Sequence, residues 1–249
     1  MTGVRRIDEI IQENADRLAV ALENHMRTSF MPDARKELRS FSAGEAAELL
    51  GMDPARLRKL HFDEKIPTVE ADVRGRRMYT AADLIGIRRS LEEQSRKRGT
   101  FLPGRREGDR IQVIAVANYK GGSSKTTTSI HLAQRLALRG YRVLAIDIDP
   151  QGSLTTMFGY TPETEFQGGG NIYDAIRYED PVPMREVIRK TYFPNLDLAA
   201  AGLVLAEFEH ETPRALQGLR EPMFFKRLGL AIDQVEADYD IVVIDCPPQ

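Results

Sequence analysis

The sequence has very little of the chemistry that builds disulfides and zinc sites. Its 249 residues include a single cysteine, Cys246, and four histidines scattered along the chain. One cysteine cannot form an intrachain disulfide, and scattered histidines lack the spacing of zinc ligands. We therefore expect a cytoplasmic protein without structural zinc.

Long apolar runs are absent too. No stretch approaches the roughly 18 apolar residues that a membrane span needs, and the polar start lacks the pattern of a secretory signal. We therefore expect no membrane partner. With 42% apolar residues the chain can still bury a core, and its length suits one or two domains.

Charge is distributed unevenly between the two parts of the chain. Residues 1–110 contain 22 Lys+Arg and 19 Asp+Glu, whereas the whole chain contains 35 and 37. The first part is therefore mildly basic and the remainder is acidic. This difference favours two domains over one.

A glycine-rich turn at residues 118–127 lies between two regular segments. The apolar run 111–117 predicts a buried strand, and the apolar spacing of 125–139 predicts a helix that Gly140 ends. Such a turn directs backbone N–H groups and the positive end of a helix dipole at one point, which suits a phosphate.

The candidate phosphate site combines small residues with two lysines. Glycine permits close approach of a ligand, Lys125 supplies a charge, and the hydroxyl of Thr126 suits magnesium. The ordinary phosphate-loop template fails here, because Tyr119 and Ser124 occupy its two glycine positions. A plain glycine turn is the alternative. The candidate residues are Lys120, Gly121, Gly122, Ser123, Ser124, Lys125, Thr126 and Thr127.

Carboxylates follow two further predicted strands. Residues 142–146 lead into Asp147-Ile148-Asp149, and the apolar run 241–244 leads into Asp245; residues 196–200 predict another strand. Ligands of open α/β sheets bind at the carboxyl ends of strands, and unpaired acids are costly there unless they hold a metal, water or another partner. Solvated acids are the alternative.

The segment before the phosphate turn predicts small capped helices. Residues 42–45 form a capping-box pattern, Asp53-Pro54 begins a second helix, residues 67–79 suit a hairpin, and residues 80–83 cap another helix. The order resembles a MerR-type winged helix, which would place the second helix in a major groove and the wing along phosphates. A solvated basic face is the alternative. The candidate DNA contacts are Arg56, Arg58, Lys59, Arg74, Arg76 and Arg77.

Two segments flank this region. Residues 4–28 predict an amphipathic helix with Ile7, Ile11, Leu18, Leu22 and Met26 near one face, which would pack on its own domain or on a second copy. Residues 96–110 are irregular, with glycine, proline and basic residues, and we interpret them as a hydrated linker; extra DNA contacts are the alternative. The expected division is 1–40 helical dimerisation segment, 41–95 winged helix-turn-helix, 96–110 linker and 111–249 nucleotide-binding domain.

The three motifs around the glycine turn resemble those of a known family. Lys120-Gly-Gly-x-x-Lys125-Thr126, Asp147-x-Asp149-Pro-Gln and Asp245-Cys-Pro-Pro, in this order, resemble the deviant Walker A ATPases of the ParA/MinD group. With the N-terminal extension, the chain resembles ParA-type partitioning ATPases, and among them the RepA proteins of repABC replicons. The resemblance implies an α/β P-loop NTPase fold, a parallel sheet flanked by helices, preceded by a mostly α winged helix-turn-helix domain.

The resemblance also implies roles for the site residues. Lys125 and the turn amides would hold the β and γ phosphates of ATP, and Thr126 would coordinate magnesium. Lys120 would reach across a nucleotide-sandwiched dimer, and Asp149 would orient the attacking water. The implied catalytic residues are Lys120, Lys125 and Asp149. The implied metal-site residues are Thr126, Asp147, Asp149 and Asp245.

The implied function is ATP-dependent DNA segregation. The protein would hydrolyse ATP with magnesium, dimerise on ATP and repress its own operon through the N-terminal domain. Its partners would be DNA, a centromere-binding ParB/RepB-type protein and a second copy, on the nucleoid in the cytoplasm. The alternative is a transcriptional regulator whose ATPase half is only a nucleotide-sensing dimerisation switch. A MinD-like membrane ATPase is disfavoured by the winged helix.

Two departures from the family pattern carry expectations. Ser124 stands where glycine is commoner, so we expect either a strained torsion or a different hydrogen-bonding pattern in the turn. Family members continue well beyond the Asp-Cys-Pro-Pro motif, so we expect that the sequence is a fragment, incomplete at its C-terminal end. Its four-stranded sheet would then have an exposed edge.

Overall fold

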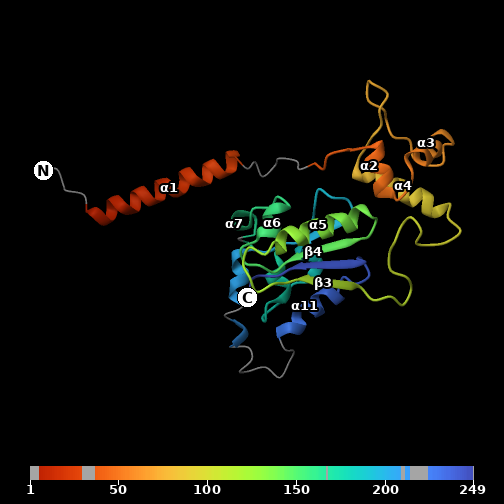
Figure 1. Ribbon diagram of the computed structural model, residues 1–249. Helices are drawn as coiled ribbons and strands as arrows, with labels where there is room; N and C mark the ends of the chain where they lie inside the picture. Colours follow the sequence, from red (N-terminus) through yellow and green to blue (C-terminus); the bar gives the residue numbers. More distant parts are fainter. Residues whose placement is uncertain (1–5, 30–36, 167, 209–210, 214–223, 249) are drawn as a thin grey trace. The chain divides into compact units, whose positions relative to one another are not determined.

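The computed structural model describes residues 6–29, 37–166, 168–208, 211–213 and 224–248. The chain separates into two compact units, residues 1–36 and residues 37–249. The first unit contains helix α1 (Ile7–Ser29), which confirms the helix predicted there (Figure 1). Ile7, Ile11, Leu18 and Leu22 are exposed on it. The side chain of Met26 lies outside the described part, as do residues 30–36.

The second unit begins with a small helical cluster. Its elements are β1 (Phe41–Ser42), α2 (Ala43–Leu50), α3 (Pro54–Phe62), β2 (Met78–Tyr79) and α4 (Ala81–Glu93). The predicted caps are present: Ser42 and Glu45 form a capping box, and the Asp53 carboxylate accepts from the amide of Ala55 at 2.7 Å. These helices share an apolar core that includes Leu57, Leu84, Ile87 and Tyr79.

The hairpin predicted over 67–79 is less regular than expected. It contains a single bridge between Ala71 and Arg77, and β2 pairs with β1 instead of with an adjacent strand. The reason lies in Asp72, whose Oδ1 accepts the amides of Arg74 and Arg76, both at 2.9 Å. A side chain therefore bonds to the turn amides that a longer ladder would otherwise use.

A five-stranded sheet forms the core of residues 111–248. Its order is β3 (Gln112–Val116), β7 (Ile241–Asp245), β4 (Val143–Asp147), β6 (Leu196–Ala199), β5 (Ile188–Lys190). The first four strands are mutually parallel, which confirms the predicted α/β class, and β5 is antiparallel to β6. The sequence predicted four strands; β5 was missed because three residues are too few to show a period.

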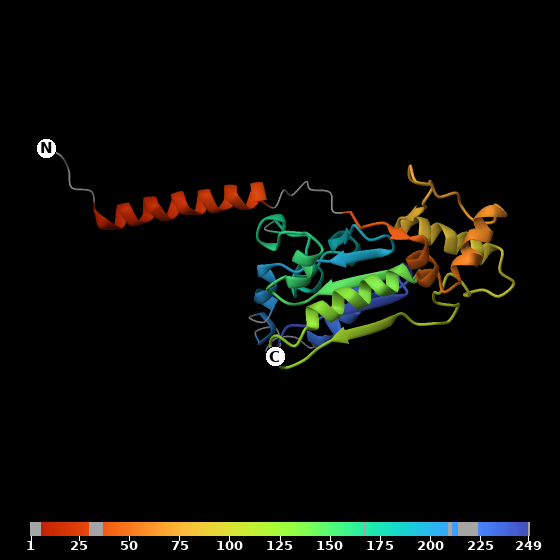
Figure 2. The same cartoon turned by 45° about the horizontal axis from the view of Figure 1, so that its top comes forward.

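Helices cover both faces of this sheet. Helix α5 (Lys125–Leu138) packs with Val143 and Ala145, and α8 (Ile172–Ile176) and α11 (Phe224–Asp233) lie on the face of Leu144 and Ile146 (Figure 1). The alternation of strand side chains produces these two cores. The same layers are visible in Figure 2. The shorter helices are α6 (Ser153–Met157), α7 (Pro162–Glu165), α9 (Met184–Val187) and η1 (Leu203–Leu205).

The strand predicted over 111–117 is formed as β3, but it is not buried as predicted, because it lies at one edge of the sheet. Strand β3 lies at the end of the sheet, and its Val113 and Ile114 are 49% and 37% exposed. Within the described residues no helix combines the length and the apolar character needed to cross a bilayer.

The segment between the helical cluster and the sheet is irregular but bonded at both ends. The carboxylate of Glu92 in α4 accepts the amides of Phe101 (2.8 Å) and Leu102 (3.1 Å) and that of Gly99. Arg105 donates to the Glu236 carboxylate at 3.2 Å and to the Glu236 carbonyl. This segment is therefore more firmly held than the hydrated linker that its composition predicts.

Candidate functional site

The carboxyl ends of three neighbouring strands meet beside the turn between β3 and α5. Asp245 lies in register with Val116 of β3 on one side and with Asp147 of β4 on the other. The Cys246 amide donates to the Val116 carbonyl at 3.3 Å, and the Ile148 amide donates to the Asp245 carbonyl at 3.0 Å. The parallel order thus brings two of the predicted acids together at the edge where open α/β sheets bind ligands.

The turn before α5 contains two residues in the left-handed conformation. Gly122 has φ 71° and Ser124 has φ 61°, so of the two alternatives expected at Ser124 the strained torsion is observed. A Cβ built on Gly121 or Gly122 would meet no atom within 4 Å, so both glycines border open space. Ser124 makes no side-chain capping bond to the first-turn amides of α5, which are the groups that bind anions at helix N-termini.

The predicted phosphate residues differ in exposure. Lys125 is only 9% exposed and Thr126 is half-buried. The Ser123 hydroxyl is buried and has no hydrogen-bond partner in the described part of the chain. The Lys120 amide donates to Asn118 Oδ1 at 3.0 Å, which shapes the turn. The exposed members are Lys120, Gly121, Gly122, Ser124 and Thr127.

Asp245 is fully buried and only half satisfied. Its Oδ1 accepts from the Ser129 hydroxyl at 2.9 Å, whereas its Oδ2 is buried without a partner among the described residues. Burial raises the pKa of Asp245 and the nearby Asp149 adds to this, against the hydroxyls of Thr126 and Ser129 and the charge of Lys125. A buried, unpartnered carboxylate oxygen beside a threonine hydroxyl fits a hydrated magnesium ion.

Asp147 is fully buried but fully bonded. Its Oδ2 accepts both the amide and the hydroxyl of Thr155 at 2.8 Å, and its Oδ1 accepts the Asp149 amide at 3.1 Å. Burial raises the pKa of Asp147 to about 7, although these hydrogen bonds oppose the shift. The Thr155 hydroxyl in turn accepts the Ala201 amide at 2.9 Å. Both oxygens of Asp147 are thus occupied in shaping the loop after β4.

The predicted carboxylates do not form a cage of their own. Within the described ranges, no group of three or more His, Cys, Asp and Glu side chains could hold a metal. Asp149 is half-exposed, and its Oδ1 accepts the Gln151 amide at 2.9 Å. A cation here would therefore share the Thr126 hydroxyl, water and the oxygens of a bound phosphate, the usual mixture for magnesium.

Sequence reasoning missed two members of this site. Ser129 lies four residues after Lys125 on α5, so helical spacing from the predicted helix start offered a signal for it. Thr155 lies in α6, eight residues after Asp147, and no short motif marks it.

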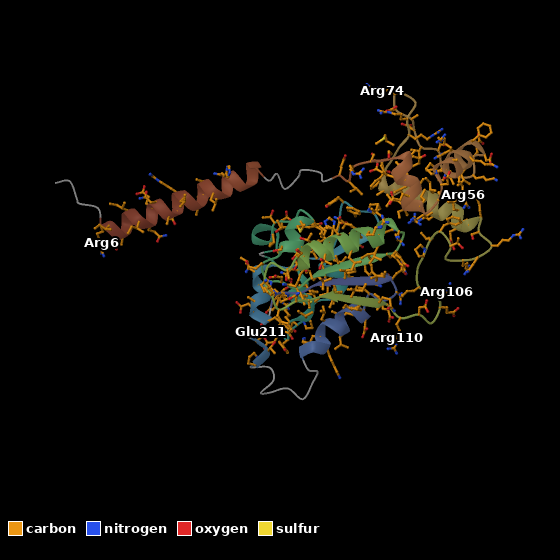
Figure 3. All side chains as sticks on the ribbon, in the orientation of Figure 1. Arg6, Arg56, Arg74, Arg106, Arg110 and Glu211 are labelled. Carbon is orange, nitrogen blue, oxygen red and sulfur yellow. The ribbon has the colours of Figure 1, made fainter. Side chains whose placement is uncertain are left out.

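The predicted DNA contacts are all exposed. Arg56, Arg58 and Lys59 lie on α3, and Arg74, Arg76 and Arg77 lie on the loop before β2. Figure 3 shows Arg56 on the helical cluster and Arg74 at the end of that loop. The loop carries less free charge than its sequence suggests, because Arg76 pairs with Asp72 at 3.0 Å.

Contacts that the sequence did not predict hold α3 in place. The His61 ring bonds the Tyr79 hydroxyl at 2.9 Å, which joins α3 to β2, and burial together with Arg77 lowers the pKa of His61. The guanidinium of Arg56 lies 5.9 Å from the ring centroid of Phe101. Both pairs join residues distant in sequence, so no local pattern revealed them.

The fold and this site together define a class. A parallel sheet, a glycine turn between its edge strand and a helix, and acids at the two neighbouring strand ends are the parts of a P-loop nucleotide-binding domain.

Comparison with known proteins agrees with this class. Residues 111–249 match the family model AAA_31, described as an AAA domain, and the chain belongs to this family. It is 44% identical over 243 residues to "Putative replication protein A" of Rhizobium rhizogenes, covering 96% of this chain but only 60% of that protein. It is 39% identical over 143 residues to chromosome partitioning protein ParA of Caulobacter vibrioides (strain NA1000 / CB15N), covering 55% of this chain and 48% of that protein.

A solved structure gives a weaker match. Cobyrinic acid a,c-diamide synthase from Mycobacterium smegmatis, with bound ADP and magnesium, aligns with a TM-score of 0.49 and 31% identity, over 56% of this chain and 52% of that one. The resemblance to ParA-type proteins, expected from the three motifs, is confirmed by the sequence relatives.

Proposed function

We propose that this protein is an ATP-dependent DNA-segregation protein of the plasmid-partition type, which hydrolyses ATP with magnesium and dimerises on ATP. The observation that carries the proposal is the unpartnered, buried Oδ2 of Asp245, beside the Thr126 hydroxyl and the open side of Gly121 and Gly122. A relative named as a chromosome partitioning protein supports the biological role.

The residues of the turn and of the neighbouring strand ends have different roles in phosphoryl transfer. Lys125 and the first-turn amides of α5 bind the β and γ phosphates, and Thr126 with Asp245 holds magnesium. When bound, magnesium neutralises charge on the phosphate oxygens. Asp149 orients the attacking water, and Asp147 fixes the Asp149 backbone through its hydrogen bond. The pattern supplies positioning and charge, which are the main requirements of this chemistry.

The remaining predicted features belong to the same proposal. Lys120 is exposed on the turn, which suits contact with phosphate bound to a second copy. Residues 41–95 form the DNA-binding domain that represses the operon, residues 1–40 assist dimerisation, and residues 96–110 connect it to the ATPase domain 111–249. The partners are DNA and a centromere-binding protein of the ParB/RepB type, on the nucleoid in the cytoplasm.

Replacing the buried lysine tests the proposal. Lys125→Ala removes the positive charge that neutralises the bound phosphates. ATP turnover should therefore fall roughly 100-fold or more, and a plasmid that depends on the protein should be lost during growth. ATP turnover and plasmid inheritance are measured for this variant and for Lys226→Ala, which removes an exposed lysine of α11.

The outcomes separate the candidate roles. Stable inheritance with Lys125→Ala would contradict the segregation role. If that variant instead lost only repression of the operon, the ATPase half would be a nucleotide-sensing switch of a transcriptional regulator.

A further inference from the structure

A broad charged hollow lies well outside the phosphate site. It has a volume of about 920 Å³ and is formed by the C-terminal half of α4 and the segment that follows it. We name it the linker groove, and its principal charged lining residues are Arg89, Glu93, Lys97, Arg98, Arg106 and Glu107. We propose that the linker groove binds the phosphate backbone of duplex DNA and extends the DNA-binding surface beyond α3 and the loop before β2.

The cations of the groove are available to a ligand. Arg89, Lys97, Arg98 and Arg106 are exposed, and within the described part of the chain none of them forms an ion pair. The fifth cation, Arg105, is occupied by Glu236. Four free cations in one hollow repel each other and favour an anionic guest.

The acidic side chains of the groove weaken its attraction for an anion only in part. Glu92 accepts three backbone amides, which stabilise its carboxylate but leave it negatively charged. Glu93 and Glu107 are exposed and unbonded among the described residues. Among the described residues, the charged side chains of the groove that form no ion pair are therefore four cations and three acids.

The backbone that carries the cations is held at several points. Glu92 bonds the amides of residues 99, 101 and 102 at one end, and the Arg105 amide donates to Asp240 Oδ1 at 3.2 Å at the other. Arg88 donates to the Phe101 carbonyl at 2.9 Å and to the Leu49 carbonyl, which ties the segment to α2 as well. A segment that is already ordered loses less conformational entropy on binding.

Continuity with α3 identifies DNA as the guest. The Arg56 guanidinium lies over the ring of Phe101, and the neighbouring Leu102 lines the groove. Figure 3 shows Arg56 on the helical cluster and Arg106 on the segment that leads from this cluster to the sheet. A duplex whose major groove holds α3 therefore passes the linker groove with its backbone, and such contacts add affinity without sequence preference. The inference rests on the proposed DNA-binding role of α3.

A salt titration with a charge-removing variant tests the inference. The double variant Lys97→Ala/Arg98→Ala is compared with Arg139→Ala/Lys226→Ala, which removes two exposed cations outside the groove. Fluorescence anisotropy measures the affinity for operon promoter DNA and for an unrelated duplex over about 50–200 mM salt. Each lost phosphate contact lowers the salt slope by about 0.9 and the affinity about 8-fold at 0.1 M salt, so the groove variant should bind both duplexes roughly 60-fold more weakly.

Two further variants make the result decisive. Lys97→Arg/Arg98→Lys keeps both charges and should restore binding, which separates loss of charge from misfolding. Arg56→Ala/Arg58→Ala should reduce the preference for promoter DNA, because it alters α3.

Unchanged affinity and slope in the groove variant would overturn the inference, while a defect confined to the α3 variant would leave the proposed function intact. A defect confined to the groove variant would show that the groove binds DNA without α3, which would contradict both the role of α3 and the inference that the groove extends its surface. Intact DNA binding with loss of binding to the ParB-type partner would show that the groove binds protein, and the inference would be wrong.

Discussion

Ser124 shows how a single residue shapes the phosphate turn. A non-glycine residue at φ 61° places its Cβ close to the following carbonyl, which costs roughly 1–2 kcal/mol. The structure adopts this torsion nonetheless, at the N-cap of α5, whose first residue is the buried Lys125. The strained torsion therefore lies directly before the helix start.

Ser124→Gly should stabilise the protein. Glycine removes the torsional strain but gains about 0.5–1 kcal/mol of chain entropy in the unfolded state, so the net gain should be about 0.5–1 kcal/mol. Urea unfolding measures it. Ser153→Gly, at the first position of α6 and without a positive φ, is the matched control and should destabilise. Equal destabilisation by both changes would contradict the strain argument.

At the scale of elements, the segment between α4 and β3, residues 94–111, behaves as an ordered element. It lacks regular structure, yet Glu92 provides its amides with a shared acceptor and Arg105 bonds it to Glu236. Side chains here replace the backbone ladder that would order a helix or strand. This explains why composition alone predicted a loose linker.

Glu92→Gln should loosen this element without unfolding its neighbours. The variant has only one carbonyl acceptor and no charge, so backbone amides of residues 99, 101 and 102 should exchange with solvent several-fold faster. Hydrogen exchange measures this, with β6 (Leu196–Ala199) as the internal reference. Glu93→Gln, a neighbouring exposed glutamate, is the control and should leave exchange unchanged. If both variants exchanged like the parent protein, Glu92 would not be what holds the segment.

At the scale of the whole molecule, Lys120 bears on whether one copy of the protein can form the complete ATP site by itself. Lys120 is exposed, whereas Lys125 is buried, so the two lysines are not equally placed to contact one phosphate. An exposed lysine at the rim of the site suits a phosphate bound by a second copy.

Lys120→Ala should therefore spare ATP binding but lower ATP-dependent dimerisation and turnover by about tenfold or more. Light scattering coupled to gel filtration, with and without ATP and magnesium, measures dimerisation, and a fluorescent ATP analogue measures binding. Lys226→Ala removes an exposed lysine of α11, outside the turn, and is the control. A dimer that forms normally with full turnover would contradict the two-copy site.

The sequence by itself determined the local features of this protein. Helix caps at Ser42, Asp53 and Thr80, the strand before the glycine turn and the helix after it all follow from short-range patterns, because capping and amphipathicity depend on residues a few positions apart. The three motifs also indicated the family. The strained torsion at Ser124 was one of the two alternatives predicted from the glycine that is commoner at this position of the motif.

Only the tertiary structure decided how these features combine. Strand β7 lies between β3 and β4, so Asp245 sits next to Asp147 although 98 residues separate them. The bonds of Asp147 to Thr155, of Asp245 to Ser129 and of His61 to Tyr79 depend on this packing. No local pattern encodes such pairs, because the free energy that selects them comes from burying the whole core and satisfying its polar groups at once.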